Sequence, residues 1–140
     1  MKKIVITGGL GYIGMELSKI YSGVTQRDSV TVVDRGFFSS RVSQLRRWGI
    51  NFEQIDILDK EKLQPLIKDA DIIYHLAGIT DVGSTLGDKN TERDREVRKV
   101  GIEGTRNIIN LSEDNTKIIF PSTHVVFEGL KNTIKNIDEE

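Results

Sequence analysis

Cysteine is absent from the sequence and only two histidines are present, and both facts exclude kinds of chemistry. Without cysteine there is no disulfide, no thiolate nucleophile and no zinc-finger ligand set, which fits a reducing compartment. His75 and His124 lie far apart and no carboxylates cluster beside them, so we expect no metal site. The apolar run between Lys3 and Thr7 is too short for a signal-peptide core or a membrane span. We therefore expect a cytoplasmic protein with no membrane partner.

An excess of charge of one sign is also lacking. Lysine and arginine number 20 and aspartate and glutamate number 21, for a net charge of −1. This balance gives no electrostatic footprint for nucleic acid, so we expect no nucleic-acid partner and expect backbone amides to hold any bound phosphate. With 140 residues, 37% of them hydrophobic, the chain is long enough for one domain with a core.

Two kinds of segment alternate along the chain. Short apolar, β-branched runs have the length and composition of buried parallel strands, and longer polar stretches between them have helical spacing. The expected strands are 3–7, 30–34, 51–56, 71–76 and 117–122. The expected helices are 12–22, 39–48, 60–68 and 91–112. This alternation predicts an α/β fold, with βαβ units, a parallel sheet and right-handed crossovers.

The longest predicted helix contains two glycines. Gly101 and Gly104 are three residues apart, on the face that also carries Val97 and Ile108. Glycine is costly inside a helix, so a face with two glycines predicts a close approach to the sheet or to another helix. The alternative is that one glycine marks a break between two shorter helices.

A glycine-rich loop follows the first expected strand and opens the first helix. Gly8, Gly11 and Gly14 have the spacing G-x-x-G-x-x-G. The first glycine permits the sharp turn, the second lets a pyrophosphate approach the backbone, and the third lets helix and strand pack closely. The helix N-terminus then presents free N–H groups and a positive dipole end to the phosphates. The loop therefore predicts a dinucleotide site in a Rossmann-type, doubly wound sheet of order 3-2-1-4-5.

An acidic residue stands where such a site needs one. Asp34 ends the second expected strand, twenty positions after Gly14, where its carboxylate can accept hydrogen bonds from the adenosine ribose hydroxyls. A carboxylate there repels a 2′-phosphate, which favours NAD over NADP. Arg35 keeps NADP open, because an arginine nearby can accommodate that phosphate. The alternative role of Asp34 is that of an ordinary strand-end turn residue.

Five segments in order resemble one family, the extended short-chain dehydrogenase/reductases, which include the nucleotide-sugar epimerases and dehydratases. Each segment lies at the matching place in the βαβ alternation. They are Thr7–Gly14 (T-G-G-x-G-x-x-G), Asp56-Ile57 (D-hydrophobic), His75–Gly78 (H-L-A-G), Gly104–Asn107 (G-T-x-N) and Phe120–Phe127 (S-T-x-x-V in the family's S-[ST]-x-x-V-Y-G).

The resemblance implies a cofactor and roles for individual residues. In this family NAD accepts hydride from a sugar hydroxyl, a tyrosine phenolate takes the proton, and a lysine lowers the pKa of that tyrosine. Thr123 matches the serine or threonine that hydrogen-bonds the reacting oxygen; alternatively its hydroxyl satisfies a local backbone group. The residues expected to bind NAD are Gly8, Gly11, Tyr12, Ile13, Gly14, Asp34, Arg35, Asp56, Ile57, Leu76, Ala77 and Gly78.

The sequence departs from the family pattern at the catalytic pair. None of the three tyrosines, Tyr12, Tyr21 and Tyr74, is followed by lysine four residues on. The family's Y-x-x-x-K comes a short way after the position of Phe127. The family's asparagine in the fourth helix is also missing, since Gly101 occupies that place.

We therefore expect residues 1–140 to be the NAD-binding part of an epimerase or dehydratase, truncated before the active-site tyrosine and lysine and the substrate domain. The expected partner of the full-length enzyme is a nucleotide sugar, and relatives form homodimers through the helix matching 91–112. We expect the 140-residue chain alone to bind NAD without turnover. The alternative is a non-catalytic dinucleotide-binding module, and a downstream Y-x-x-x-K would favour the enzyme.

Overall fold

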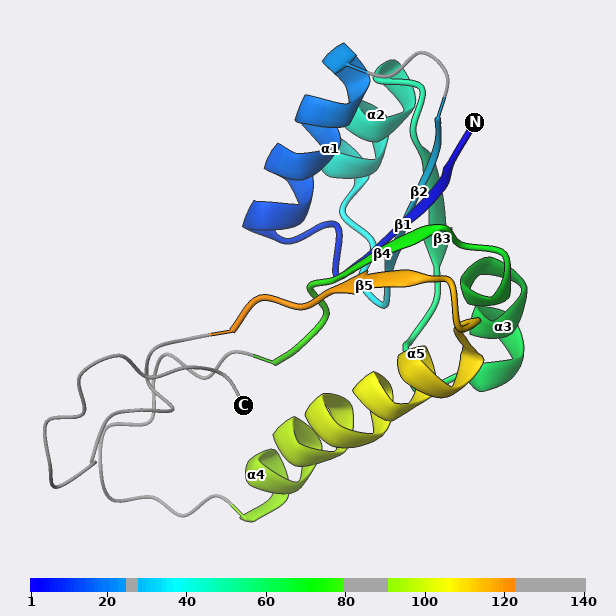
Figure 1. Cartoon of the computed structure of the whole chain (residues 1–140). Helices are drawn as coiled ribbons and strands as arrows, with labels where there is room; N and C mark the ends of the chain where they lie inside the picture. Colours follow the sequence, from blue (N-terminus) through cyan, green and yellow to red (C-terminus); the bar gives the residue numbers. More distant parts are fainter. Residues whose placement is uncertain (25–27, 80–90, 123–140) are drawn as a thin grey trace, which may run out of the picture.

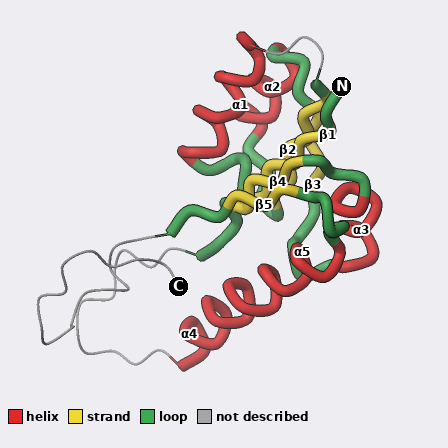
Figure 2. Tube along the Cα trace, viewed as in Figure 1, coloured by secondary structure: helices red, strands yellow, loops and turns green. Residues whose placement is uncertain are grey.

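Five parallel strands and their connecting helices form the part of the chain that the computed structural model describes, residues 1–24, 28–79 and 91–122 (Figures 1 and 2). The strand order is β3-β2-β1-β4-β5, which confirms the predicted α/β class and the order 3-2-1-4-5. The strands are β1 (Lys3–Thr7), β2 (Ser29–Asp34), β3 (Asn51–Gln54), β4 (Ile72–His75) and β5 (Lys117–Ile119). The helices are α1 (Tyr12–Val24), α2 (Ser39–Arg47), α3 (Lys60–Lys68), α4 (Thr91–Arg98), the π-helix η1 (Lys99–Gly104) and α5 (Thr105–Leu111).

The central strands are apolar on both faces, so each face needs a covering layer. Ile4 and Ile6 of β1 pack in the core beside α1 and α2. Val5 of β1 and Val33 of β2 pack in a second core beside α3 and α5. Figure 1 shows α1 and α2 on one side of the sheet and α3, α4 and α5 on the other. Burial of each such side chain contributes roughly 1.5–3 kcal/mol, which makes this three-layer arrangement the stable one.

The last strand is shorter than the sequence predicts. β5 ends at Ile119, whereas the prediction extended the strand to Ser122. Pro121 explains the early end, because proline has no N–H to donate to the strand ladder and restricts the residue before it. Within the described residues β5 pairs with β4 alone, so it forms an edge of the sheet.

The predicted helix over 91–112 is continuous from α4 through η1 to α5, but its middle has π geometry. The alternative of two separate helices is therefore wrong. Gly104 makes the predicted close approach, since a Cβ there would lie 2.3 Å from Ile57 Cδ1. Gly101 does not, because it is exposed and a Cβ there would meet nothing within 4 Å. The wider i→i+5 turn of η1 changes the angle between residues three apart, which removes Gly101 from the packed face.

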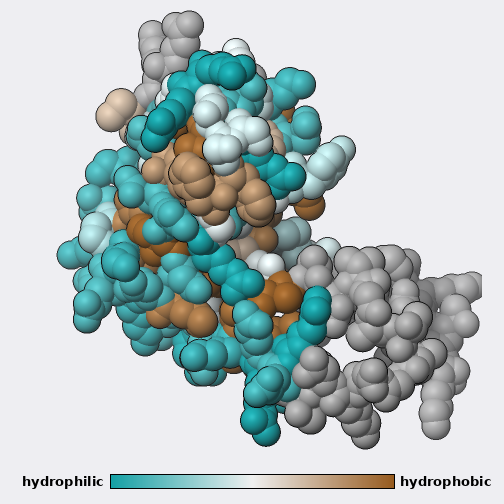
Figure 3. All heavy atoms as spheres, turned by 180° about the vertical axis from the view of Figure 1, so that it is seen from behind, coloured by the Kyte–Doolittle hydropathy of each residue, from teal (hydrophilic) through white to brown (hydrophobic). Residues whose placement is uncertain are grey.

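Some large hydrophobic side chains remain on the surface. From behind, brown hydrophobic areas are visible between teal hydrophilic ones (Figure 3). Tyr12 and Ile13 at the start of α1 are exposed, as are Ile102 of η1 and Ile109 of α5. The first pair lies at the glycine loop, and the second pair lies on the helix through which a dimer is expected to form.

Candidate cofactor site

A cavity of about 430 Å³ opens where the strands β1, β2 and β4 end. This edge of a parallel α/β sheet, on either side of the first strand, is where ligands bind in such folds. All twelve residues that the sequence predicts for the cofactor line the cavity. Their role as cofactor ligands stays a prediction. Four further lining residues, which the sequence analysis missed, are Val33, Ile55, Val100 and Pro121.

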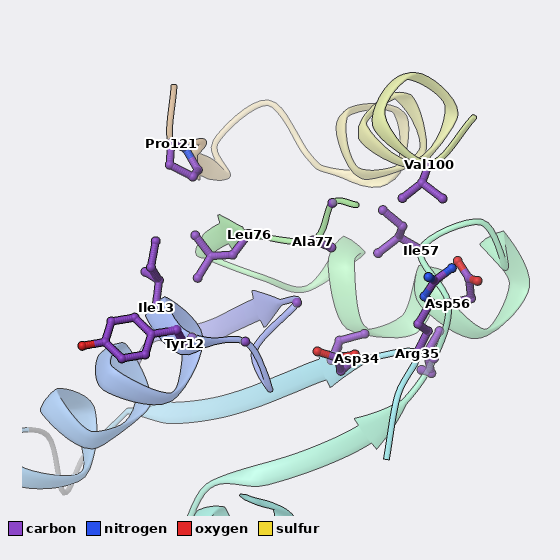
Figure 4. Close-up of a pocket in the computed structure, with 16 residues that line it drawn as sticks. Tyr12, Ile13, Asp34, Arg35, Asp56, Ile57, Leu76, Ala77, Val100 and Pro121 are labelled. Carbon is purple, nitrogen blue, oxygen red and sulfur yellow. The ribbon is translucent and has the colours of Figure 1, made fainter. Parts of the chain in front are cut away.

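The cavity has two distinct ends. Figure 4 shows Tyr12 and Ile13 at one end, and Asp34 and Asp56 at the other. Ala77 lies between them, beyond the end of β4. The shape is elongated, as a site for an extended molecule with two different ends requires.

The glycine loop has the geometry that a close phosphate approach needs. Gly8 has φ +66° and a Cβ there would lie 2.6 Å from Ala77 Cα, so the turn requires glycine. A Cβ on Gly14 would lie 2.4 Å from Gly9 Cα, so the third glycine packs against the loop itself. A Cβ on Gly11 would meet, among the described residues, only the carbonyl oxygen of Gly8, at 3.1 Å. The backbone at Gly11 is thus left open, and the first N–H groups of α1 have no partners within their helix.

Asp34 connects the glycine loop to the segment after β2. Its Oδ2 accepts from the backbone N–H of Leu10 at 3.0 Å, and its Oδ1 accepts from the N–H of Gly36 at 2.9 Å. A carboxylate has about four acceptor positions, so these two bonds leave capacity for ribose hydroxyls. The bond to Gly36 is the one expected of an ordinary turn residue. Asp34 also lines the cavity, which a role in the turn alone does not require.

Arg35 is held by an ion pair. Its Nη1 lies 3.1 Å from Glu96 Oε1 of α4, and both side chains are about half exposed. The cation that could bind a 2′-phosphate is therefore already paired with a carboxylate of α4.

The Asp56-Ile57 pair forms another wall and is fixed by helix α5. Asp56 Oδ1 accepts from the N–H of Leu58 at 2.9 Å, which leaves Oδ2 without a described partner. The buried Asn107 donates from Nδ2 to the carbonyl oxygen of Ile57 at 2.9 Å. Gly104 allows the helix to approach the Ile57 side chain. The G-T-x-N segment thus shapes this wall from outside the cavity.

His75 is buried and has a structural environment. Its Nδ1 lies 2.8 Å from Thr7 Oγ1, and its Nε2 lies 2.9 Å from Thr105 Oγ1. Thr7 Oγ1 also accepts from the N–H of Ala77 at 3.4 Å. Each ring nitrogen of His75 thus has a threonine hydroxyl as its partner, and a hydroxyl can donate or accept. Burial lowers the pKa of His75 below its ordinary value, which favours the neutral imidazole.

Tyr21 and Tyr74 do not have the setting of a proton acceptor for substrate. Tyr21 and Tyr74 bond to each other through their hydroxyls at 2.8 Å, on the face covered by α1. Burial, together with this bond, raises the pKa of Tyr21, whereas a phenolate base needs a lowered pKa. Thr123, the predicted catalytic residue, and His124 lie outside the described residues.

The described residues hold neither a candidate metal cluster nor a helix that could span a membrane. No group of three or more histidine, aspartate or glutamate side chains there is arranged to hold a metal ion. No helix in the described ranges has the length and apolarity needed to cross a membrane.

The sheet order and the cavity define a Rossmann-type dinucleotide-binding fold. The chain belongs to the 3-beta hydroxysteroid dehydrogenase/isomerase family, whose model matches residues 5–140. The resemblance to the extended short-chain dehydrogenase/reductases is thereby confirmed.

Two curated proteins that the chain resembles are, by their names, enzymes that act on UDP-sugars. The chain is 33% identical over 128 residues to UDP-N-acetyl-alpha-D-glucosaminuronate decarboxylase of Bacillus cytotoxicus, covering 90% of this chain and 38% of the relative. It is 26% identical over 133 residues to UDP-glucose 4-epimerase of Mycoplasma genitalium, covering 94% of this chain and 38% of the relative. The chain thus spans about two fifths of the length of these curated relatives.

A solved structure shows the same fold. UDP-glucose 4-epimerase from Stenotrophomonas maltophila, with bound NAD and formylated UDP-arabinopyranose, superposes with a TM-score of 0.74 at 23% identity. The match covers 94% of this chain and 40% of that one.

Proposed function

We propose that residues 1–140 form the NAD-binding part of an epimerase- or dehydratase-type enzyme that oxidises a hydroxyl of a nucleotide sugar. The observation that carries this proposal is the meeting of the glycine loop, Asp34 and Asp56 around one elongated cavity. The relatives support the substrate class, since those named above act on UDP-sugars by their names.

The residues of the cavity fit the parts of NAD in order. Gly11, which has no side chain, would let the pyrophosphate approach, and the N–H groups at the start of α1 would donate to its oxygens. Asp34 would accept hydrogen bonds from the adenosine ribose hydroxyls, and Asp56, which keeps one oxygen without a described partner, would lie at the adenine end. Ile57 and Val100 give that end an apolar wall. Bound NAD supplies the hydride acceptor.

The same residues favour NAD over NADP. Asp34 repels a 2′-phosphate, and Arg35 is paired with Glu96 rather than free to receive one. A surface pair of this kind contributes only about 0–1 kcal/mol, so Asp34 makes the larger contribution to this preference.

The proton chemistry needs groups beyond the described cavity. Thr123 would hydrogen-bond the reacting oxygen, and the tyrosine and lysine of the family pattern are not found within residues 1–140. The chain alone would therefore bind NAD without turnover. A non-catalytic dinucleotide-binding module is the second candidate, and it is favoured if the natural protein has no Y-x-x-x-K after Phe127.

The long helix α4–η1–α5 would form the homodimer contact. Ile102 and Ile109 are exposed by 53% and 56%, seven residues apart in the same helical stretch. Light scattering should show a dimer whose dissociation constant rises in I102K. A monomeric wild-type chain would contradict this assignment. A cytoplasmic location stays a prediction.

Calorimetric titration with NAD tests the proposed site through two matched variants. Gly11→Val places a branched side chain beside the open backbone, and Gly11 does not have positive φ, so the variant should fold. Gly23→Val makes the same change at an exposed position of α1 where a Cβ meets nothing within 4 Å. We expect NAD to bind the wild type and G23V but not G11V. Equal binding by G11V and wild type would show that the site is elsewhere.

A further inference from the structure

Leu10, in the turn between β1 and α1, has both of its backbone polar groups held by side chains, one from the end of β2 and one from α2. Its N–H donates to Asp34 Oδ2 at 3.0 Å. Its carbonyl oxygen accepts from Nη1 of Arg41, a residue of α2. The Leu10 side chain is itself 1% exposed in the core. The middle of the glycine loop is thus fixed by two opposite charges and one buried side chain.

These bonds fix two consecutive peptide planes. The Gly9–Leu10 plane is held by Asp34 through the Leu10 N–H. The Leu10–Gly11 plane is held at both ends, by Arg41 on the carbonyl oxygen and by the Gly11 N–H, which donates to Gly8 O at 3.0 Å. Gly11 has no Cβ, so its backbone can adopt either orientation of this peptide with little steric cost. Arg41 and the Gly8 carbonyl oxygen therefore together restrain a peptide plane whose orientation the glycine itself does not fix.

Arg41 is itself oriented by a neighbour. Its guanidinium carbon lies 5.3 Å from the ring centroid of Phe38, the residue that precedes α2. Arg41 does not line the cavity, so any effect on a bound dinucleotide passes through Leu10.

We propose that Arg41 is a positioning residue for phosphate binding, which with Asp34 clamps Leu10 and keeps the Leu10–Gly11 peptide in one orientation. This inference rests on the proposed NAD site. With the clamp, the Leu10 carbonyl points to the guanidinium, and the N–H groups at the start of α1 remain available to the pyrophosphate. Without Arg41, the Leu10–Gly11 peptide also samples a flipped orientation. The Leu10 carbonyl oxygen then no longer points to α2, and its partial negative charge repels the pyrophosphate.

The clamp predicts that loss of Arg41 weakens the binding of ligands that contain phosphate and not of ligands that lack it. In Arg41→Ala, the dissociation constants for ADP and NAD should rise about tenfold, equivalent to about 1.4 kcal/mol. The constant for adenosine, which lacks phosphate, should stay within about twofold of wild type. Arg41→Lys keeps a charged donor and should recover part of the loss. Arg46→Ala, an exposed arginine of the same helix's last turn, should bind all three ligands as wild type does.

Backbone-amide NMR provides both the titrations and a second measurement. Exchange of the Gly11 amide hydrogen should be faster in R41A than in R46A, because the Leu10–Gly11 plane is less restrained. If R41A binds ADP as wild type does, or loses adenosine and ADP equally, the clamp is wrong. If R41A is unstable, R41K decides: a raised dissociation constant for ADP and faster Gly11 exchange than in wild type, with adenosine binding unchanged, support the clamp, and wild-type values of all three contradict it.

Different results would overturn the proposed function and the clamp. A wild-type chain that binds neither ADP nor NAD overturns the proposed function and the clamp together. A wild-type chain that binds NAD, with binding lost in Gly11→Val but unchanged in Arg41→Ala, overturns the clamp and leaves the proposed function intact.

Discussion

Two glycines of the same helical stretch should respond in opposite directions to the same substitution. A Cβ on Gly104 would lie 2.3 Å from Cδ1 and 2.8 Å from Cγ1 of the buried Ile57. A Cβ on Gly101 would meet no atom within 4 Å, and this position is exposed. Gly101→Ala therefore isolates the intrinsic helix effect, and Gly104→Ala adds a steric conflict to it.

The magnitudes follow from these contacts. Replacing glycine by alanine in a helix stabilises by up to about 1 kcal/mol, so G101A should raise the free energy of unfolding by roughly 0.5–1 kcal/mol. Overpacking a core costs about 1–3 kcal/mol, so G104A should lower it by a net of roughly 0–2 kcal/mol. Ile57→Val removes the Cδ1 atom at 2.3 Å and should relieve part of the cost.

Urea unfolding followed by circular dichroism measures these differences. The double variant G104A/I57V should be more stable than the sum of the two single changes, with a coupling above about 0.5 kcal/mol. If G101A and G104A shift the unfolding midpoint equally and in the same direction, the close packing of the helix on Ile57 is refuted.

Three further predictions concern pH, the cofactor and the loop. The pKa of His75 is lowered in the folded state, so the unfolded chain takes up a proton first as the pH falls; the contribution of His75 to stability should be full above about pH 6.5 and be lost as the pH drops through the folded-state pKa. Thermal melts across this range should show a fall in melting temperature that is smaller in H75N. An equal fall in H75N would contradict the prediction. Glu96→Gln should release Arg35 and raise NADP affinity about two- to fivefold, since such a surface ion pair contributes about 0–1 kcal/mol, while NAD affinity stays unchanged. Calorimetric titration measures both affinities. Unchanged NADP binding would show that Arg35 does not reach the 2′ position. Gly8→Ala should lower the free energy of unfolding by more than about 1 kcal/mol in urea titrations, because Gly8 has φ +66° and a Cβ there would meet the Ala77 backbone. A G8A variant as stable as wild type would show that the turn does not require glycine at this position.

Local patterns in the sequence were sufficient for the architecture. Successive apolar residues occur at Ile4–Ile6 and at Val32–Val33, as expected for strands covered on both faces, and both cores confirm this. The end of β5 was predicted three residues too late. The prediction followed the apolar side chain of Phe120 and did not take into account that Pro121 has no N–H to donate to a neighbouring strand.

The site was predictable where a motif is continuous along the chain. Gly8 to Gly14 and Asp34 belong to one βαβ unit, so their spacing fixes their relation to the cavity. Val100 was missed because its side chain reaches the cavity only through the packing of η1, which no local spacing encodes. Arg41 was missed for a similar reason, since its contact with the Leu10 carbonyl joins elements that are 31 residues apart.

The most direct test of the central claim is to map where NAD binds on residues 1–140. Backbone-amide chemical shifts should change on NAD addition at Gly8–Gly14, Asp34, Asp56-Ile57 and Ala77-Gly78, around one saturable site. Absent or unsaturable changes, or changes confined to residues outside this cavity, would contradict the assignment of the glycine loop as the cofactor site.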